Sequence, residues 1–450
     1  MYSVSILSCL RFANGEQPFL IMLQFNTMAL LQVALDLING KRAIQIAKEA
    51  LEGGADWLEA GTPLIKAEGM EIVRQLSRLG KVVADMKTMD VGSVEAEMVA
   101  KAGASVISIL GLASDETVKE VVEAARKYGI EVMVDLLGVK DVERRAKEVE
   151  KLGVDYICVH TGIDEQMLGE SVFDALEKVA RVCSIPVAVA GGINSETAGE
   201  AVRKGASIVI VGGAIIKAEK VKEATQNIKK AMQGARIESK LFRKYKREEI
   251  KKAFKMVSTC NICDAMHNRG AMRGIKPLKA GYKMAGKALT VRTIDGDWAK
   301  VIEAIDMADE NTIIVVEEHG DKAIWGELAT NSAVVKKIEG VVIDGSIRDV
   351  DHIKKLDIPV FYRNINPEAG EPKGYGEIGT EIKCGGQVVK KGDWIVGDDN
   401  GVVVIPKEIA VEIANRAMNV MERENRIREE IRRGSSLAKV LELRKWEKVR

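Results

Sequence analysis

The sequence predicts an α/β protein in two parts: an N-terminal (β/α)8 TIM barrel, followed by a C-terminal α+β domain of the swivelling β/β/α-like kind. Three observations support this prediction. Between residues 28 and 233, short apolar runs alternate with amphipathic stretches about every 25 residues. After residue 250 the rhythm changes to strands of mixed spacing. The chain of 450 residues is also long enough for two domains of ordinary size.

Composition and charge exclude several classes of protein. With 46% hydrophobic and 30% charged residues, the chain can bury two cores, which argues against disorder. Lys and Arg total 67 and Asp and Glu total 66, so there is no overall field to attract nucleic acid or an anionic membrane. No apolar run reaches the roughly 20 residues that a membrane helix needs. The six cysteines are sparse and do not suggest a secreted disulfide framework, so we expect a cytoplasmic protein.

Eight apolar runs are expected to form the barrel strands. They are continuous and β-branched, which is typical of parallel strands buried on both faces. A doubly wound open sheet is the alternative, but eight such regular units favour a closed barrel. The amphipathic stretches between them, such as 43–51 and 118–127, are expected to be helices. The predicted strands are 31–36, 57–60, 82–85, 106–110, 132–136, 156–160, 187–190 and 208–211.

The remaining segments differ from the barrel in composition. Residues 1–27 do not match its pattern, so we expect an extension that is either disordered or the result of a start codon assigned too early. Residues 234–250 are charged and non-periodic, and are interpreted as a linker whose basic side chains face solvent. Residues 251–450 are expected to form the second domain, and their charged end, 409–443, to be a surface helix or an oligomerisation arm. Its predicted strands are 288–294, 312–316, 341–343, 360–363, 380–382, 394–397 and 402–405.

Charged or titratable residues end four of the eight predicted barrel strands. Catalytic groups of such barrels lie at the carboxyl ends of the strands, where side chains from different strands meet. Here these ends carry Asp36, Glu59, Asp85 and His160. Because the runs are otherwise apolar, we expect these side chains to form one active site.

The third strand ends in the pattern Asp85-x-Lys87-x-x-Asp90. Side chains alternate along a strand, so Asp85 and Lys87 should point into the same mouth. An ammonium group beside a carboxylate keeps both charged, which leaves Asp85 free to bind a metal. With Glu59 of the neighbouring strand, it forms a candidate ligand pair for Mg²⁺ or Mn²⁺, which prefer hard oxygen ligands. A surface cluster of salt bridges is the plainer interpretation, and the position at the barrel rim disfavours it.

Two glycine turns follow the seventh and eighth strands. Glycine lets backbone N–H groups approach an anion closely, and the helix that follows adds partial positive charge. Many barrels bind phosphate at these two positions, so the substrate is expected to carry one phosphate group. The residues concerned are Gly191, Gly192, Gly212, Gly213 and Ala214.

With these motifs, residues 28–233 resemble the 3-hexulose-6-phosphate synthase family, whose suprafamily includes orotidine 5′-phosphate decarboxylase and 3-keto-L-gulonate-6-phosphate decarboxylase. The resemblance implies a reversible, magnesium-dependent aldol condensation of formaldehyde with D-ribulose 5-phosphate, giving D-arabino-hex-3-ulose 6-phosphate. Glu59 stands where the orotidine enzymes have Lys, which suits a metal-dependent member. The segments that carry the resemblance are 33–36, 59–63, 85–90, 159–164 and the two glycine turns.

The resemblance also implies roles for the rim residues. His160 is the candidate general base, since imidazole has the intrinsic pKa nearest neutrality. Lys87 is expected to stabilise the developing oxyanion, with Asp36 and Asp90 orienting hydroxyl groups and Lys87. In this suprafamily Asp90 comes from the neighbouring subunit, so a homo-oligomer is expected. Two alternatives stay open: decarboxylation of 3-keto-L-gulonate 6-phosphate, and a barrel that only binds a sugar phosphate and scaffolds the second domain.

A second group of polar residues lies in the C-terminal half, where twenty residues separate Glu327 from Arg348. The N–H groups of Gly326 and Leu328 at a helix start suit a carboxylate. Arg348 can bind an anion, and Asp349 can ligate Mg²⁺ directly or through water. This half resembles the family of regulator of ribonuclease E activity A and 4-hydroxy-4-methyl-2-oxoglutarate aldolase, whose aldolases have Asp in place of Glu327. The resemblance implies a metal-dependent lyase for a 2-oxo acid, or a binding or regulatory module.

Overall fold

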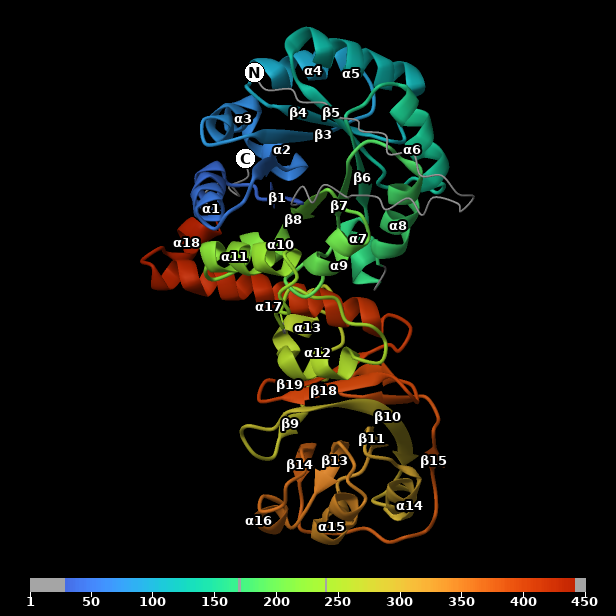
Figure 1. The fold of residues 1–450 in the computed structure, drawn as a ribbon. Helices are drawn as coiled ribbons and strands as arrows, with labels where there is room; N and C mark the ends of the chain where they lie inside the picture. The colour runs from blue at the N-terminus through green and yellow to red at the C-terminus, as the bar shows by residue number, and fades with distance from the viewer. Residues whose placement is uncertain (1–28, 169–170, 239–240, 442–450) are drawn as a thin grey trace, which may run out of the picture.

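The computed structural model describes residues 29–168, 171–238 and 241–441, so the extension expected over 1–27 lies outside the described residues. The first part is a closed barrel of parallel strands in chain order, from β1 to β8. The second part is a mixed α/β domain around its own sheet. Figure 1 shows the two parts at opposite ends of the molecule, with helix α17 between them. The predicted fold class is therefore confirmed.

The barrel alternates strands and helices as the periodicity predicts. Its strands are β1 (Leu30–Leu35), β2 (Trp57–Ala60), β3 (Val82–Thr88), β4 (Val106–Leu110), β5 (Glu131–Asp135), β6 (Tyr156–His160), β7 (Val187–Ala190) and β8 (Ile208–Val211). Its helices are α1 (Gly40–Glu52), α2 (Thr62–Glu68), α3 (Met70–Ser77), α4 (Gly92–Lys101), α5 (Asp115–Tyr128), α6 (Val142–Lys151), α7 (Ile163–Met167), α8 (Phe173–Val182), α9 (Ala198–Arg203), α10 (Gly213–Ile216) and α11 (Val221–Met232). Polar N-caps such as Asn39 and Ser114, each of which accepts a backbone N–H through its side chain, begin α1 and α5.

Two apolar layers stabilise the barrel. Outward-facing strand residues pack against the surrounding helices. Inward-facing residues, among them Val83, Val106, Met133 and Ile208, fill the interior. The barrel is thus a packed core rather than a pore, and its polar side chains gather where the strands end.

The second domain is built on a sheet of order β19-β18-β10-β11-β13-β14-β9, in which β10, β11, β13 and β14 are parallel. Its strands are β9 (Lys276–Pro277), β10 (Met284–Thr293), β11 (Thr312–Glu318), β12 (Ala323–Trp325), β13 (Gly340–Ile347), β14 (Val360–Ile365), β15 (Glu377–Ile378), β16 (Ile382–Cys384), β17 (Gln387–Val389), β18 (Trp394–Asp398) and β19 (Gly401–Ile405). The remaining helices are α12 (Ile250–Met256), α13 (Thr259–Ala265), α14 (Ala299–Met307), α15 (Glu327–Val335), α16 (Val350–Ile353), α17 (Ala410–Arg432) and α18 (Leu437–Val440). Strands β9, β12, β15 and β17 were not predicted, because two or three residues are too short for a periodic pattern.

Helix α17 connects the two domains. It packs with α12 and α13 against β18 and β19 in an apolar core. On its barrel side, fully buried Asn415 donates to the carbonyl of Met167 (3.1 Å) and accepts the N–H of Tyr245 (2.8 Å). Arg426, only 1% exposed, donates to the carbonyl of Ala218 (3.2 Å). The expectation of a surface helix over 409–443 is therefore wrong for α17, whereas α18 has no buried residue. In the part of the chain that the structure describes, no helix is long and apolar enough to cross a membrane.

Candidate active site

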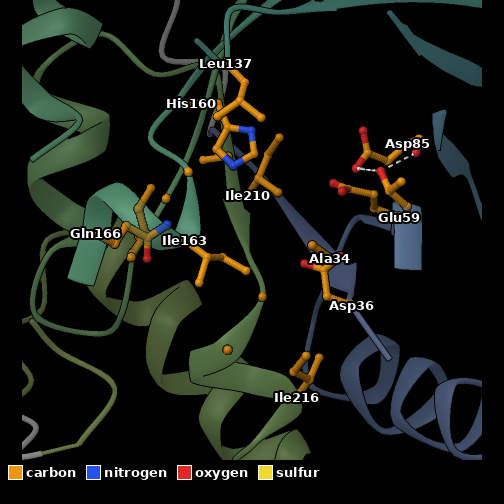
Figure 2. A pocket seen from close by; sticks show the side chains of 18 of the residues that line it. Ala34, Asp36, Glu59, Asp85, Leu137, His160, Ile163, Gln166, Ile210 and Ile216 are labelled. Atoms are coloured by element: carbon orange, nitrogen blue, oxygen red, sulfur yellow. Dashed lines mark hydrogen bonds between the residues drawn. The ribbon is translucent and has the colours of Figure 1, made fainter. Parts of the chain in front are cut away.

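A cavity of about 500 Å³ opens at the carboxyl ends of the barrel strands, a size typical of small-ligand sites. Five charged or titratable residues among those predicted line it: Asp36, Glu59, Asp85, Lys87 and His160. In Figure 2, Glu59 and Asp85 lie next to each other on one side of the cavity, and His160 faces it from another. Asp90 is exposed and does not line this cavity. The structure thus brings together residues from four separate strand ends.

Several elements fix the Asp85 carboxylate. Thr62, at the start of α2, donates to its Oδ2 (2.8 Å), and Ser108 in β4 donates to its Oδ1 (3.1 Å). The Nζ of Lys87 also donates to Asp85, at 3.1 Å. The backbone of Lys87 is left-handed, with φ of 50°, and the register between β3 and β4 shifts at this point. A left-handed backbone is unfavourable for a residue other than glycine. At Lys87 this conformation directs the ammonium group into the cavity at some cost in folding free energy.

Asp135, at the end of β5, is a site residue that the sequence analysis missed. Its Oδ2 lies 2.8 Å from Nζ of Lys87 and 2.8 Å from Nδ1 of His160. Burial alone would raise the pKa of Asp135, but the hydrogen bonds and charges of His160 and Lys87 lower it to about 2. The signal was present, since Asp135 ends an apolar run like the other rim residues. Extending the predicted strand to residue 136 made it look like an interior position.

Three carboxylates crowd one side of the cavity. Burial, followed by the charges of Asp85 and Asp36, raises the pKa of Glu59 well above its ordinary value. Burial and then the charge of Asp85 also raise the pKa of Asp36, whose side chain is nevertheless accessible to solvent. Gln32, a second residue that the sequence analysis missed, donates to Oε2 of Glu59 at 2.5 Å. Gln32 lies near the start of the predicted first strand, far from its charged end, and therefore offered no signal.

The closeness of these carboxylates bears on whether the cavity suits a divalent cation. Glu59 and Asp85 present hard oxygens, and a cation between them would relieve the repulsion that raises the pKa of Glu59. Among the described residues, no three His, Cys, Asp or Glu side chains gather as a ligand set. A cation held by two carboxylates would therefore keep positions open for water or substrate oxygens, as Mg²⁺ usually does in proteins.

The two glycine turns line another part of the same cavity. Gly191 and Gly192 have φ of 118° and 67°, values that favour glycine. A Cβ on Gly191 would lie 2.7 Å from the carbonyl oxygen of Thr161, so no larger residue fits there. Gly212 and Gly213 also line the cavity, as does Ala214. The turns leave space and backbone N–H groups for an anion near the strand ends.

Further lining residues come from outside the predicted strand ends, and the sequence analysis missed them too. Lys217 follows α10, Lys244 lies in the segment between the domains, and Asn419 and Glu422 belong to α17. The interpretation of the linker's basic residues as solvent-facing is wrong for Lys244, because this residue lines the cavity.

The second domain brings together its own predicted residues. The Oδ2 of Asp349 accepts the backbone N–H of Glu327 (3.2 Å) and lies 3.6 Å from Nε of Arg348. A Cβ on Gly326 would lie 2.6 Å from that same Oδ2, so a larger residue there would displace the Asp349 carboxylate. The backbone of Asp349 is left-handed, with φ of 57°. Leu328, in the first turn of α15, is 79% exposed. These residues therefore form a compact, solvent-accessible group at the start of α15.

Comparison with known proteins finds a matching protein family for each half of the chain. The family model "Orotidine 5′-phosphate decarboxylase / HUMPS family" matches residues 29–228, and the RraA-like model, "Aldolase/RraA", matches residues 259–404. The 3-hexulose-6-phosphate synthase of Bacillus subtilis is 42% identical over 203 residues, which are 44% of this chain and 96% of the relative. An uncharacterised protein of Methanocaldococcus jannaschii is 45% identical over 194 residues, which are 42% of this chain and 92% of the relative.

Solved structures also match the barrel. The 3-hexulose-6-phosphate synthase of Salmonella typhimurium covers 45% of this chain and 98% of its own, with 32% identity and a TM-score of 0.44. The sequence relatives are matched along nearly their whole length at more than 40% identity. Through its barrel, the chain therefore belongs to the orotidine 5′-phosphate decarboxylase / HUMPS family, and it carries an RraA-like domain fused behind that barrel.

Proposed function

We propose that the barrel is a cytoplasmic aldehyde-lyase that joins formaldehyde to D-ribulose 5-phosphate, giving D-arabino-hex-3-ulose 6-phosphate, in a reversible reaction that depends on Mg²⁺ or Mn²⁺. The observation that carries the proposal is the single cavity in which carboxylates, Lys87 and His160 face two glycine turns. The relatives named 3-hexulose-6-phosphate synthase support the choice of reaction. The described cysteines are free, which suits the cytoplasm.

The proton transfers follow from the contacts of Asp135. When its carboxylate accepts the Nδ1–H of His160, the other ring nitrogen, Nε2, has a free lone pair and can remove the C1 proton of the ketose. Burial alone would lower the pKa of Lys87, but Asp85 and Asp135 raise it, so Lys87 stays protonated and acts as a donor rather than a base. C1 of the resulting enediolate attacks the formaldehyde carbon, and the new alkoxide takes the proton that Nε2 of His160 had removed, which restores the neutral imidazole.

A cation on Glu59 and Asp85 would act as a Lewis acid for the ketose oxygens. Lys87 donates to the oxyanion that develops as the C1 proton leaves. Asp36, at the accessible side of the cavity, orients substrate hydroxyl groups. The glycine turns bind the phosphate at the far end of the substrate, which fixes C1 relative to His160.

We assign Asp90 to the active site of a second copy of the chain. It is exposed, and exposed apolar residues adjoin it in sequence, including Met89 (49%), Val91 (58%) and Val94 (51%). Such a group of apolar side chains is typical of a surface that another subunit covers. We therefore propose a homo-oligomer in which Asp90 of one subunit completes the site of the next.

For the second domain we propose a metal-dependent lyase site for a 2-oxo acid, in preference to a purely regulatory module. The supporting observation is the group at the start of α15, where the Arg348 side chain is 44% exposed and Asp349 is its one ion-pair partner among the described residues. Arg348 binds the substrate carboxylate together with the N–H groups of Gly326 and Leu328, and Asp349 holds the cation.

The first prediction concerns the reaction itself. The full chain should consume formaldehyde when ribulose 5-phosphate and Mg²⁺ are present, and excess EDTA should abolish this activity. Asp85→Ala should lower kcat/KM by about 10³-fold, because a ligand and the partner of Lys87 are lost together. The exposed Asp174→Ala in α8 is the control and should match the wild type. Absence of formaldehyde consumption with any divalent metal, combined with CO₂ release from 3-keto-L-gulonate 6-phosphate, would identify the decarboxylase instead.

The second prediction concerns Asp135. Asp135→Asn should lower kcat by about 100-fold, while the affinity for ribulose 5-phosphate changes little. The neutral amide no longer stabilises a protonated His160, and its NH₂ group must face a donor, either the Leu137 N–H or Lys87. Since the pKa of Asp135 is about 2, the wild-type carboxylate is ionised at neutral pH, and the loss should be constant between roughly pH 6 and pH 9. Initial rates across this range provide the measurement. A variant with the wild-type kcat would remove Asp135 from the mechanism.

The third prediction tests the use of Asp90 between subunits. Asp85→Ala and Asp90→Ala proteins should each be inactive alone. After joint unfolding and refolding, their mixture should regain about a quarter of the wild-type activity, because half of the dimers are mixed and each mixed dimer has one intact site. If the mixture stays inactive while wild-type protein survives the same treatment, Asp90 acts within its own subunit or not at all.

The fourth prediction tests the second domain. The chain should release pyruvate from oxaloacetate or from 4-hydroxy-4-methyl-2-oxoglutarate, and Arg348→Ala should reduce kcat/KM by about 100-fold through loss of the carboxylate contact. The exposed Arg269→Ala provides a matched control outside this group. Pyruvate release that is the same in Arg348→Ala and wild type, or absent from both, leaves the regulatory module as the better explanation.

A further inference from the structure

The barrel cavity is completed by residues that lie outside both family-matched ranges. The matches end at residue 228, resume at 259 and end again at 404. Lys244, Asn419 and Glu422 fall outside these ranges, yet they line the cavity together with Lys217 of the barrel. We call these four residues the cap cluster. They are contributed by the junction of the two domains rather than by the barrel alone.

Lys217 is directed at the second glycine turn by α17. A Cβ on Gly213 would lie 3.4 Å from Nζ of Lys217, so this ammonium group lies directly beside the turn. Nζ donates a hydrogen bond to Oδ1 of Asn419. Asn419 therefore determines where the Lys217 charge lies relative to the glycine N–H groups.

Lys244 is positioned by a residue with a left-handed backbone two positions earlier. Phe242 has φ of 60°, which is unfavourable for a bulky side chain. Its N–H donates to Oε1 of Glu422 (2.6 Å), and its carbonyl accepts from Nδ2 of Asn194 (2.9 Å). Asn194 closes the first glycine turn and is 2% exposed. Helix α17 and the loop after β7 thus hold this segment from both sides.

The two lysines are partly buried in the cavity wall. Among the described residues, Lys217 donates to the Asn419 amide and Lys244 contacts the Met167 sulfur (3.7 Å), and neither has a carboxylate within ion-pair distance. Burial lowers the pKa of Lys217, and burial also lowers that of Lys244 to about 8, while the nearby charge of Glu422 opposes both shifts. Two desolvated cations next to two anion-binding turns favour an incoming dianion.

Resting on the proposed function, we propose that Lys217 and Lys244 bind the phosphate group of the barrel's substrate, and that α17 positions them through Asn419 and Glu422. The glycine turns supply N–H donors and the lysines supply the positive charge that these neutral turns lack. Residues encoded after the second family-matched range thereby determine how tightly the barrel binds its phosphorylated substrate.

The experiment measures binding directly in the full chain. Calorimetric titration with ribulose 5-phosphate and with inorganic phosphate should give dissociation constants about tenfold or more weaker for Lys217→Met and for Lys244→Met, as expected for the loss of a charge-assisted hydrogen bond. Steady-state rates with ribulose 5-phosphate should show the loss in KM, with kcat within about twofold of the wild type.

Asn419 provides a readout that separates positioning from a structural role. Asn419→Asp keeps an oxygen acceptor for Lys217 but adds a negative charge beside the phosphate. If Lys217 binds phosphate, Asn419→Asp should weaken phosphate binding more than Asn419→Ala does. If Asn419 only holds the helix in place, Asn419→Asp should resemble the wild type. Asn425→Ala, on the same helix and outside the cavity, is the matched control, and thermal melting verifies that every variant is folded.

The outcomes separate this inference from the proposed reaction. A wild-type chain that binds ribulose 5-phosphate without consuming formaldehyde would contradict the proposed aldol reaction. The binding constants of the lysine variants would still test the role of the cap cluster. Lysine variants that bind both ligands within about twofold of the wild type would overturn the inference, whatever the turnover. A wild-type chain that binds neither ligand at millimolar concentration would overturn it as well.

Discussion

The repulsion among the carboxylates at the barrel rim is the constraint on which the site depends. Asp36, Glu59 and Asp85 converge from three strands, and burial with mutual repulsion makes the ionised form of Glu59 costly. Lys87 offsets part of this charge, but only because a left-handed backbone and Asp135 hold its ammonium group in the cavity. A positive charge placed beside Glu59 would relieve this repulsion, and the contacts that hold Lys87 also orient His160 through Asp135.

Much of the barrel could be predicted from the sequence, because a buried parallel strand must be continuously apolar and its charged end is then easy to detect. Glu59, Asp85 and His160 were found in this way. Asp135 was missed through an error of one residue in a strand boundary, a common uncertainty for apolar runs. Lys244 and Glu422 could not have been found by this means. They lie in charged segments whose pattern is the same whether a side chain faces solvent or a cavity, and only tertiary packing distinguishes the two.

The two family-matched regions are joined by segments that belong to neither. Helix α17 buries Asn415, Glu422 and Arg426, polar residues that would normally face water, and each hydrogen-bonds to backbone of the barrel or the joining segment. Such directional contacts allow one relative placement of the domains, whereas a purely apolar junction would tolerate sliding. The polar character of the helix, which suggested a surface position, instead specifies the fit between the domains.

The position of α17 has a consequence for the order in which the protein matures. All eight barrel strands lie before residue 212, so the barrel can close while the ribosome is still translating the second domain. Helix α17 begins at Ala410 and must return across nearly 200 residues of later chain to reach a barrel that has already folded. The nascent barrel therefore lacks part of its cavity wall until α17 has been synthesised, and a chain terminated before α17 would carry an incomplete site.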